Sequence, residues 1–174
     1  MGVFVLFFAA IGVGFLLILL IGFTSPKRAP LDLRASSGGS PLVELDAEQL
    51  GKVVSVLLDK MGLELDRAAG GRGGILEIHA ENPTPVTGGK VLVHCIPAPT
   101  DTGRVDGPMV GTFIRAVRSA YVSKGLLFTT GDISADGRLE AEDAPVELFD
   151  RVQLTRLIEQ HIGPIDSDAL RRIP

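Results

Sequence analysis

A pair of short apolar runs in the middle of the chain constrains the fold more than any other feature. They lie in the stretch GGRGGILEIHAENPTPVTGGKVLVHCI, which extends from Gly70 to Ile96. The first run, ILEIHA, alternates apolar and polar residues as a half-buried strand does, and the second, KVLVHCI, is rich in residues that favour strands. The proline and glycine residues between the two runs are typical of a turn. We therefore predict a β-hairpin.

The residues before the hairpin predict a helix followed by a strand. Asp46 and Gln49 are spaced as in a capping box, and apolar residues recur at helical spacing as far as Met61. Gly62 is expected to end this helix, because glycine readily adopts the left-handed conformation that follows many helices. Residues 63–67 are predicted to form a strand that leads into the glycine-rich turn.

The residues after the hairpin predict helices that alternate with strands. Asp106 is expected to cap a helix over residues 108–123, and the apolar run LLFTT, residues 126–130, is typical of a strand buried on both faces. The apolar face predicted for that helix comprises Met109, Phe113, Ile114, Val117 and Tyr121. Ser134 and Asp150 are predicted to cap two further helices, with the short strand VELF between them. This order predicts an α/β sandwich with a central mixed sheet flanked by helices.

The first part of the chain is predicted to anchor it in a membrane. Residues 3–23 contain no charged or strongly polar side chain, and a helix of that length crosses a bilayer core of roughly 30 Å. A cleaved signal peptide is the alternative, but it favours a basic residue before the apolar run and a clear cleavage pattern after it. Lys27, Arg28 and Arg34 follow the run. They predict a single pass through the inner or cytoplasmic membrane, with the C-terminal domain in the cytoplasm.

Composition bounds the domains and their partners. The predicted parts are a transmembrane helix over residues 1–24, a flexible linker over 25–41, a folded domain over 42–162 and a loosely ordered tail over 163–174. The net charge of −4 gives no support for nucleic-acid binding by an overall basic surface. Cys95 is the only cysteine in the sequence. We expect it to be a buried thiol rather than a nucleophile, and we expect no disulfide-linked partner.

Three local patterns resemble the Mrr-type restriction endonuclease domain, a branch of the PD-(D/E)XK nuclease superfamily. They are LLDKMGLEL, GGRGGILEIHA and GLLFTTGDISADGRLEAEDAPVELFD, and the resemblance covers about residues 45–161. The third pattern is the most specific, because several residue types recur in order along it. The resemblance implies a restriction-endonuclease-like α/β sandwich in which the predicted hairpin carries the metal site.

The catalytic positions of that family are altered in this sequence. The family has an Asp on the first hairpin strand, followed by Gln-x-Lys or Glu-x-Lys on the second, and the resemblance places these positions at Leu76, His94 and Ile96. Glu77 lies one step from the Asp position, so its side chain is expected to face the other side of the sheet unless the strand slips or bulges. Carboxylates that hold Mg²⁺ and a cation beside the attacking water are needed for this hydrolysis. We therefore expect no catalytic residues, no metal and no cofactor.

Two alternative sites remain open. Glu77, His79 and Glu81 are spaced by two, so they share one face of the strand, and together with His94 they could form a relocated metal site. The alternative is the solvated face of an amphipathic strand. A nucleic-acid contact surface is the second candidate, against an ordinary solvated helix surface. Its residues would be Arg104, Arg115, Arg118 and Lys124.

We predict a membrane-anchored, Mrr-like domain that is catalytically inert and acts by binding nucleic acid or protein. The alternative is a metal-dependent DNA endonuclease with a rearranged active site, that is, a type IV restriction-like endodeoxyribonuclease that uses Mg²⁺ or Mn²⁺. A third hypothesis is an interaction subunit of a membrane-bound system.

Overall fold

The computed structural model describes residues 41–70, 74–85, 88–98 and 103–163. The chain divides into two compact units, residues 1–37 and 38–174, and all described residues lie in the second. The predicted membrane span over residues 3–23 and the linker over 25–40 lie outside the described residues, as does the tail from residue 164. Within the described ranges, no helix combines the length and the apolar character that a membrane crossing requires.

The described unit alternates strands and helices. Its helices are η1 (Pro41–Glu44, a 3₁₀ helix), α2 (Ala47–Lys60), α3 (Gly107–Ser119), α4 (Ala135–Ala141) and α5 (Arg151–His161). Its strands are β1 (Glu64–Gly70), β2 (Leu76–Asn82), β3 (Gly89–Ile96), β4 (Arg104–Val105), β5 (Lys124–Thr129), β6 (Asp132–Ile133) and β7 (Val146–Phe149). The mixed α/β class predicted from the sequence is confirmed.

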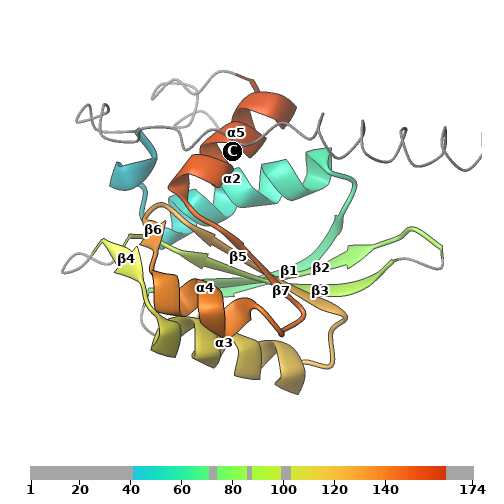
Figure 1. Ribbon diagram of the computed structural model, residues 1–174. Helices are drawn as coiled ribbons and strands as arrows, with labels where there is room; N and C mark the ends of the chain where they lie inside the picture. The colour runs from blue at the N-terminus through green and yellow to red at the C-terminus, as the bar shows by residue number, and fades with distance from the viewer. Residues whose placement is uncertain (1–40, 71–73, 86–87, 99–102, 164–174) are drawn as a thin grey trace, which may run out of the picture. The chain divides into compact units, whose positions relative to one another are not determined.

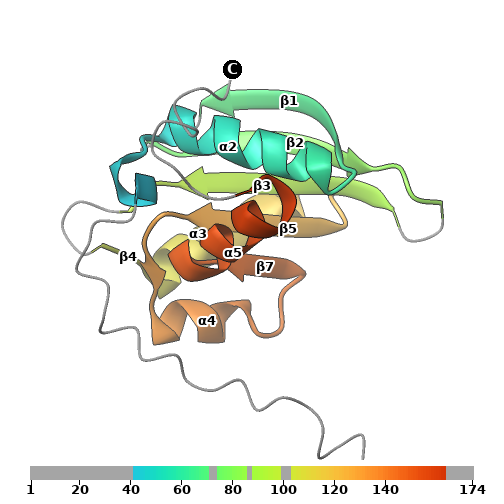
Figure 2. The same ribbon diagram turned by 90° about the horizontal axis from the view of Figure 1, so that it is seen from above.

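A five-stranded sheet in the order β1-β2-β3-β5-β7 forms the centre of the unit. β1, β2 and β3 pair in antiparallel fashion, and β3, β5 and β7 run parallel to one another. The predicted hairpin is therefore the β2–β3 pair, and β3 joins the antiparallel half of the sheet to the parallel half. β4 and β6 form a small parallel pair at one end of the sheet (Figures 1 and 2).

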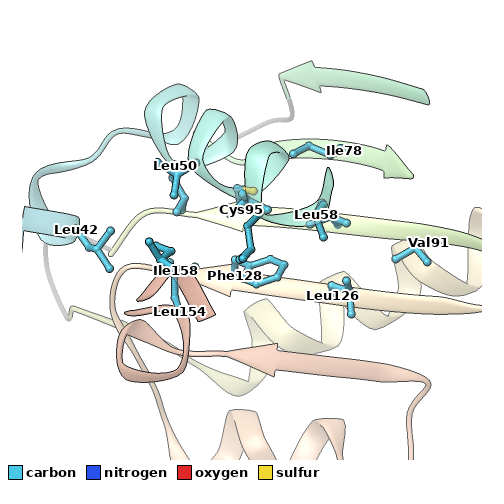
Figure 3. Packing of buried hydrophobic residues seen from close by; sticks show 14 residues of the cluster. Leu42, Leu50, Leu58, Ile78, Val91, Cys95, Leu126, Phe128, Leu154 and Ile158 are labelled. Carbon is cyan, nitrogen blue, oxygen red and sulfur yellow. The ribbon is translucent and has the colours of Figure 1, made fainter. Parts of the chain in front are cut away.

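Helices cover both faces of the sheet. α2 and α5 lie on one face, and α3 and α4 lie on the other (Figure 1). The core beneath α2 and α5 contains Cys95, Phe128 and Leu154, which point into the space between the sheet and the two helices (Figure 3). The second core, beneath α3, contains Leu92, Ile96 and Leu127 in addition to residues of the helix itself.

Local signals set the ends of the helices. Asp46 and Gln49 form the predicted capping box, with Asp46 Oδ1 accepting from the Gln49 amide at 2.8 Å and Gln49 Oε1 accepting from the Asp46 amide at 3.1 Å. Asp106, Ser134 and Asp150 are the predicted N-caps of α3, α4 and α5. Each cap satisfies a backbone amide that has no partner within its own helix.

The end of α3 differs from the prediction. The helix ends at Ser119 rather than Ser123, and Tyr121 adopts a φ of 52° in the turn that follows. Tyr121 is 94% exposed, so the prediction that it belongs to the apolar face is wrong. The turn is followed by β5, which α3 approaches closely: a Cβ atom at Gly125 would lie 2.4 Å from Val117 Cγ2.

Two other differences concern strands. β1 runs to Gly70, three residues beyond the predicted end of the first strand. The two-residue strands β4 and β6 were not predicted, since they are too short to show a period of two.

Candidate functional site

The face of β2 and β3 beneath α3 holds the polar cluster that the sequence singles out. In the antiparallel register Glu77 lies directly opposite His94, and His79 lies opposite Leu92. Residues that oppose one another across an antiparallel pair point to the same face, and residues two apart on a strand do so as well. Glu77, His79 and His94 are thereby brought together.

Glu77 joins the two imidazoles. Its Oε1 atom lies 2.9 Å from His79 Nε2, and its Oε2 atom lies 3.1 Å from His94 Nε2. An ionised carboxylate only accepts hydrogen bonds, so both imidazoles donate from Nε2. His94 is only 8% exposed, and its ring packs against Phe113 of α3 with 4.7 Å between ring centroids. The side chains of Glu77 and His79 remain partly exposed.

Burial and hydrogen bonding set the charge of the cluster. Burial raises the pKa of Glu77, but the hydrogen bonds from His79 and His94 together lower it by more. The net effect is a pKa below the usual value of a glutamate. Burial lowers the pKa of His94 below 6.5, and the hydrogen bond to Glu77 only partly offsets this effect. At neutral pH the cluster therefore contains a carboxylate and a neutral, donating His94.

Leu76 lies on the opposite face of the sheet from His94 and Ile96. Its side chain packs toward α2, where a Cβ atom at Gly51 would lie 1.8 Å from Leu76 Cδ2. Ile96 belongs to the core beneath α3. The three positions that the resemblance assigns to metal binding and catalysis therefore do not share a face.

Glu77 reaches the face of His94 without any irregularity in its own strand. The β2–β3 register is continuous, and the register shift in the neighbouring β1–β2 pair falls on β1, between Leu65 and Arg67. The condition that β2 must slip or bulge for Glu77 to face this side is therefore wrong. Glu81, the last member of the acidic and imidazole stripe, is exposed. It pairs with Lys90, four positions along the register from the place where Glu77 pairs with His94.

The donor set of this face does not fit Mg²⁺. Mg²⁺ prefers an octahedral set of oxygen ligands, whereas the cluster offers one carboxylate, both of whose oxygens already accept hydrogen bonds from imidazoles. Ile96, the position that the resemblance aligns with the family's lysine, is 4% exposed and carries no charge. Across the described parts of the chain, no group of three or more His, Cys, Asp or Glu side chains is arranged to hold a metal ion.

The four predicted nucleic-acid contacts are spread over the molecule. Lys124 begins β5, whereas Arg104 pairs with Asp132 in β6, beyond the other end of β5. A strand of six residues separates these ends by roughly 20 Å. Lys124 Nζ also donates to Glu147 Oε1 at 2.7 Å. Arg115 and Arg118 are exposed on α3. The structure therefore does not gather the four cations into one compact patch.

A cavity of about 680 Å³ lies where the parallel strands end. Its lining comes from the segments that follow β3, β5 and β7 and from η1. The lining residues are Val43, Ala98, Gly103, Arg104, Asp106, Thr130, Gly131, Asp132, Ser134 and Arg151. Sequence reasoning missed this cavity, because the residues come from separate loops. Polar residues that closely follow the apolar strands, such as Thr130 and Arg151, are the signal that could have indicated it.

Comparison with known proteins gives one family match. The family model described as a restriction endonuclease, Mrr_cat, matches residues 42–158. Among solved structures, the DNA modification-dependent restriction endonuclease AspBHI is similar, with 17% sequence identity and a TM-score of 0.43 over 78% of this chain and 45% of that chain. The chain thus spans less than half the length of that protein. No curated protein matches the chain.

Proposed function

Because the chain belongs to the Mrr-type restriction endonuclease family, we propose that its folded domain is a member that has lost DNA cleavage and acts by binding. The observation that carries this proposal is the chemistry of the face beneath α3. Ile96 is a buried hydrocarbon in the core, where the family resemblance places a lysine. An alkyl group neither orients an attacking water nor offsets the negative charge of the transition state.

The state of Glu77 supports the same conclusion. Phosphodiester hydrolysis by this route needs several oxygen ligands that converge on a metal. Glu77 supplies the only carboxylate of the described cluster, and each of its two oxygens already accepts a hydrogen bond from one imidazole. Releasing those oxygens for a metal would leave the buried His94 without its hydrogen-bond partner, which is costly. The cluster is therefore better suited to stabilising the hairpin than to holding a metal.

The proposal includes attachment to the membrane through residues 3–23, with the domain in the cytoplasm. Its support is the uninterrupted apolar run and the basic residues that follow it. The domain would then present a binding surface near the inner face of the membrane, to nucleic acid or to a protein partner, either alone or as an interaction subunit of a membrane-bound system.

A second candidate function is a metal-dependent DNA endonuclease with a rearranged site. The convergence of Glu77, His79 and His94 on one face favours it. A set with two imidazoles prefers Mn²⁺ or Zn²⁺ over Mg²⁺. Such an enzyme would need the carboxylate to rotate away from at least one imidazole.

A cleavage assay distinguishes the two candidates. The full chain in detergent micelles is incubated with plasmid and with methylated DNA in the presence of Mg²⁺, Mn²⁺ or Zn²⁺, beside a Glu77→Ala, His94→Ala double variant. We expect no cleavage by either protein. A Glu81→Ala, His161→Ala double variant removes the same residue types outside the cluster and is the matched control.

Cleavage by the wild type and by the control, but not by the cluster variant, would overturn the inert assignment and establish the second candidate. Cleavage by all three proteins would indicate a contaminating nuclease. If none cleaves, retardation of labelled DNA that weakens steeply with salt would identify nucleic acid as the partner. If the labelled DNA is not retarded, binding to a protein partner would be the function that the proposal retains.

A further inference from the structure

We propose that the cavity at the ends of the parallel strands binds a small sugar phosphate, either free or as part of a mononucleotide. The carboxyl ends of parallel strands in an open α/β sheet are where such ligands commonly bind. The segments that follow β3, β5 and β7 all contribute to the cavity. Its volume of about 680 Å³ falls within the range of about 300–1,000 Å³ that small-molecule sites occupy.

Arg151 is the group that would hold the phosphate. It is the first residue of α5, and its backbone amide donates to the Gly131 carbonyl at 3.0 Å, which fixes the start of the helix against the loop after β5. Its Nη2 atom lies 3.9 Å from Asp132 Oδ1, which is too long for a hydrogen bond. Within the described residues, this ion pair is the polar contact of the guanidinium. Its donors are thus available for the bidentate pairing that guanidinium groups form with phosphate.

Carboxylates beside the guanidinium point to a ligand with hydroxyl groups. Asp132 lines the cavity with a side chain that is about half exposed. Asp106 also lines it, and its Oδ1 atom caps α3 by accepting from the Met109 amide at 3.0 Å. Carboxylate oxygens in this type of sheet accept hydrogen bonds from sugar hydroxyls. The positive charges of Arg104 and Arg151 are offset by the negative charges of the two aspartates. A ligand with an anionic end and a hydroxyl-bearing end should therefore bind this lining more tightly than a bare anion does.

Hydrogen bonds tie several segments of the cavity rim to one another. Thr130 Oγ1 accepts from the Ala98 amide at 2.9 Å, which ties the segment after β5 to the segment after β3. Ser134 Oγ donates to the Val105 carbonyl at 3.0 Å and accepts from the Gly137 amide at 3.2 Å. These hydroxyls hold the segments that they join in place, which lowers the cost of ordering those segments when a ligand binds.

The proposal does not depend on whether the domain cleaves DNA, since Glu77, His79 and His94 do not line the cavity. A sugar phosphate could therefore bind in either case. It would be a ligand of the domain rather than a substrate of the cluster on β2 and β3.

Calorimetric titration of the full chain in detergent micelles tests the proposal. The probes are ribose 5-phosphate, adenosine 5′-monophosphate, adenosine and inorganic phosphate. We expect at least one of the two sugar phosphates to bind about tenfold or more tightly than adenosine and inorganic phosphate. Binding of both would extend the ligand class to nucleotides, and binding of ribose 5-phosphate alone would restrict it to free sugar phosphates.

Variants assign the binding to the cavity. Arg151→Gln is expected to weaken binding about tenfold or more. Arg151→Lys should have an intermediate effect, since lysine keeps the positive charge but cannot donate two parallel hydrogen bonds to a phosphate. Arg156→Gln, on the same helix and outside the cavity lining, is the matched control and should bind as the wild type does. Asp132→Asn should weaken binding of the sugar phosphate, because a hydroxyl acceptor is lost, but should not weaken binding of inorganic phosphate, because the change removes a negative charge beside Arg151.

Several results would overturn the proposal. One is the absence of binding at millimolar concentration, and another is equal affinity for inorganic phosphate and both sugar phosphates. A third is an equal loss of sugar-phosphate affinity in the Arg151→Gln and Arg156→Gln variants when both melt as the wild type does. Binding of a duplex oligonucleotide that depends on Arg151, without binding of either small sugar phosphate, would also reject a small-molecule site. None of these results bears on the cleavage assay.

Discussion

Leu127→Ala is expected to be among the most destabilising single truncations in the domain. Leu127 lies in the middle of β5 and has no exposed surface. In the parallel registers it lies between His94 of β3 and Leu148 of β7. Its side chain belongs to the core beneath α3, together with Phe113 and Val117 of that helix. Truncation would leave a cavity. The residues around that cavity are already packed, so they cannot readily move in to fill it.

The size of the effect follows from its burial. Leucine-to-alanine changes in cores cost about 2–5 kcal/mol, the sum of the lost transfer free energy and the cavity left behind. The domain has about 120 residues, so its unfolding entropy near 60 °C is about 250 cal/mol/K. A loss of about 3 kcal/mol in the free energy of unfolding therefore lowers the melting temperature by about 12 °C. A domain of this size is stable by about 5–15 kcal/mol, which exceeds this loss, so the variant should still fold at room temperature.

Thermal unfolding followed by circular dichroism measures this shift. Leu139→Ala is the matched control, since Leu139 on α4 is 70% exposed and should change the free energy of unfolding by no more than about 0.5 kcal/mol. Leu127→Asp should be worse than Leu127→Ala, because it also buries an unpaired charge. Equal melting temperatures for the Leu127→Ala and Leu139→Ala proteins would refute the central place of β5 in the core.

Three further predictions concern the membrane, the domain and pH. The full chain should resist carbonate extraction from membranes, and a reporter fused after Pro174 should be cytoplasmic; release of a soluble species cleaved near Thr24 would contradict this. A fragment of residues 41–174 should be soluble and unfold in one cooperative transition, and persistent aggregation would show that the boundary is wrong. Acidification from about pH 7.5 to 5.5 should lower the melting temperature of the wild type more than that of His94→Gln, because burial lowers the pKa of His94 from 6.5 and only the unfolded chain binds that proton. Equal slopes would count against a buried, neutral His94.

Elements whose signals are local could be predicted from the sequence. The side chain of Asp46 satisfies an amide three residues away, and Asp150 does the same at the start of α5. Such contacts are encoded in a few consecutive residues, so they survive whatever the rest of the chain does. The apolar run of β5 was equally clear, because a strand buried on both faces needs no partner sequence to be recognised.

Features that depend on distant segments could not be predicted. Tyr121 lies four residues after Val117 and continues its helical spacing, yet the chain leaves the helix two residues earlier to enter β5. The sequence motif suggested Leu76 as the metal-ligand position, but only the β2–β3 register reveals that Glu77 shares a face with His94. A shift of one residue in an alignment exchanges the two faces of a strand, so no motif alone could decide between them.

The position of Cys95 also makes the domain its own reporter of unfolding. Cys95 is the only cysteine of the chain, it has no exposed surface beneath α2, and burial raises the pKa of its thiol far above the usual range. A thiol-reactive reagent acts on the exposed thiolate, so it can label this protein only when the sheet and α2 separate. When the reagent reacts faster than the domain recloses, the labelling rate equals the opening rate, and when it reacts more slowly, the rate gives the free energy of opening. The opening of the core can thus be followed in the intact chain without introducing any probe.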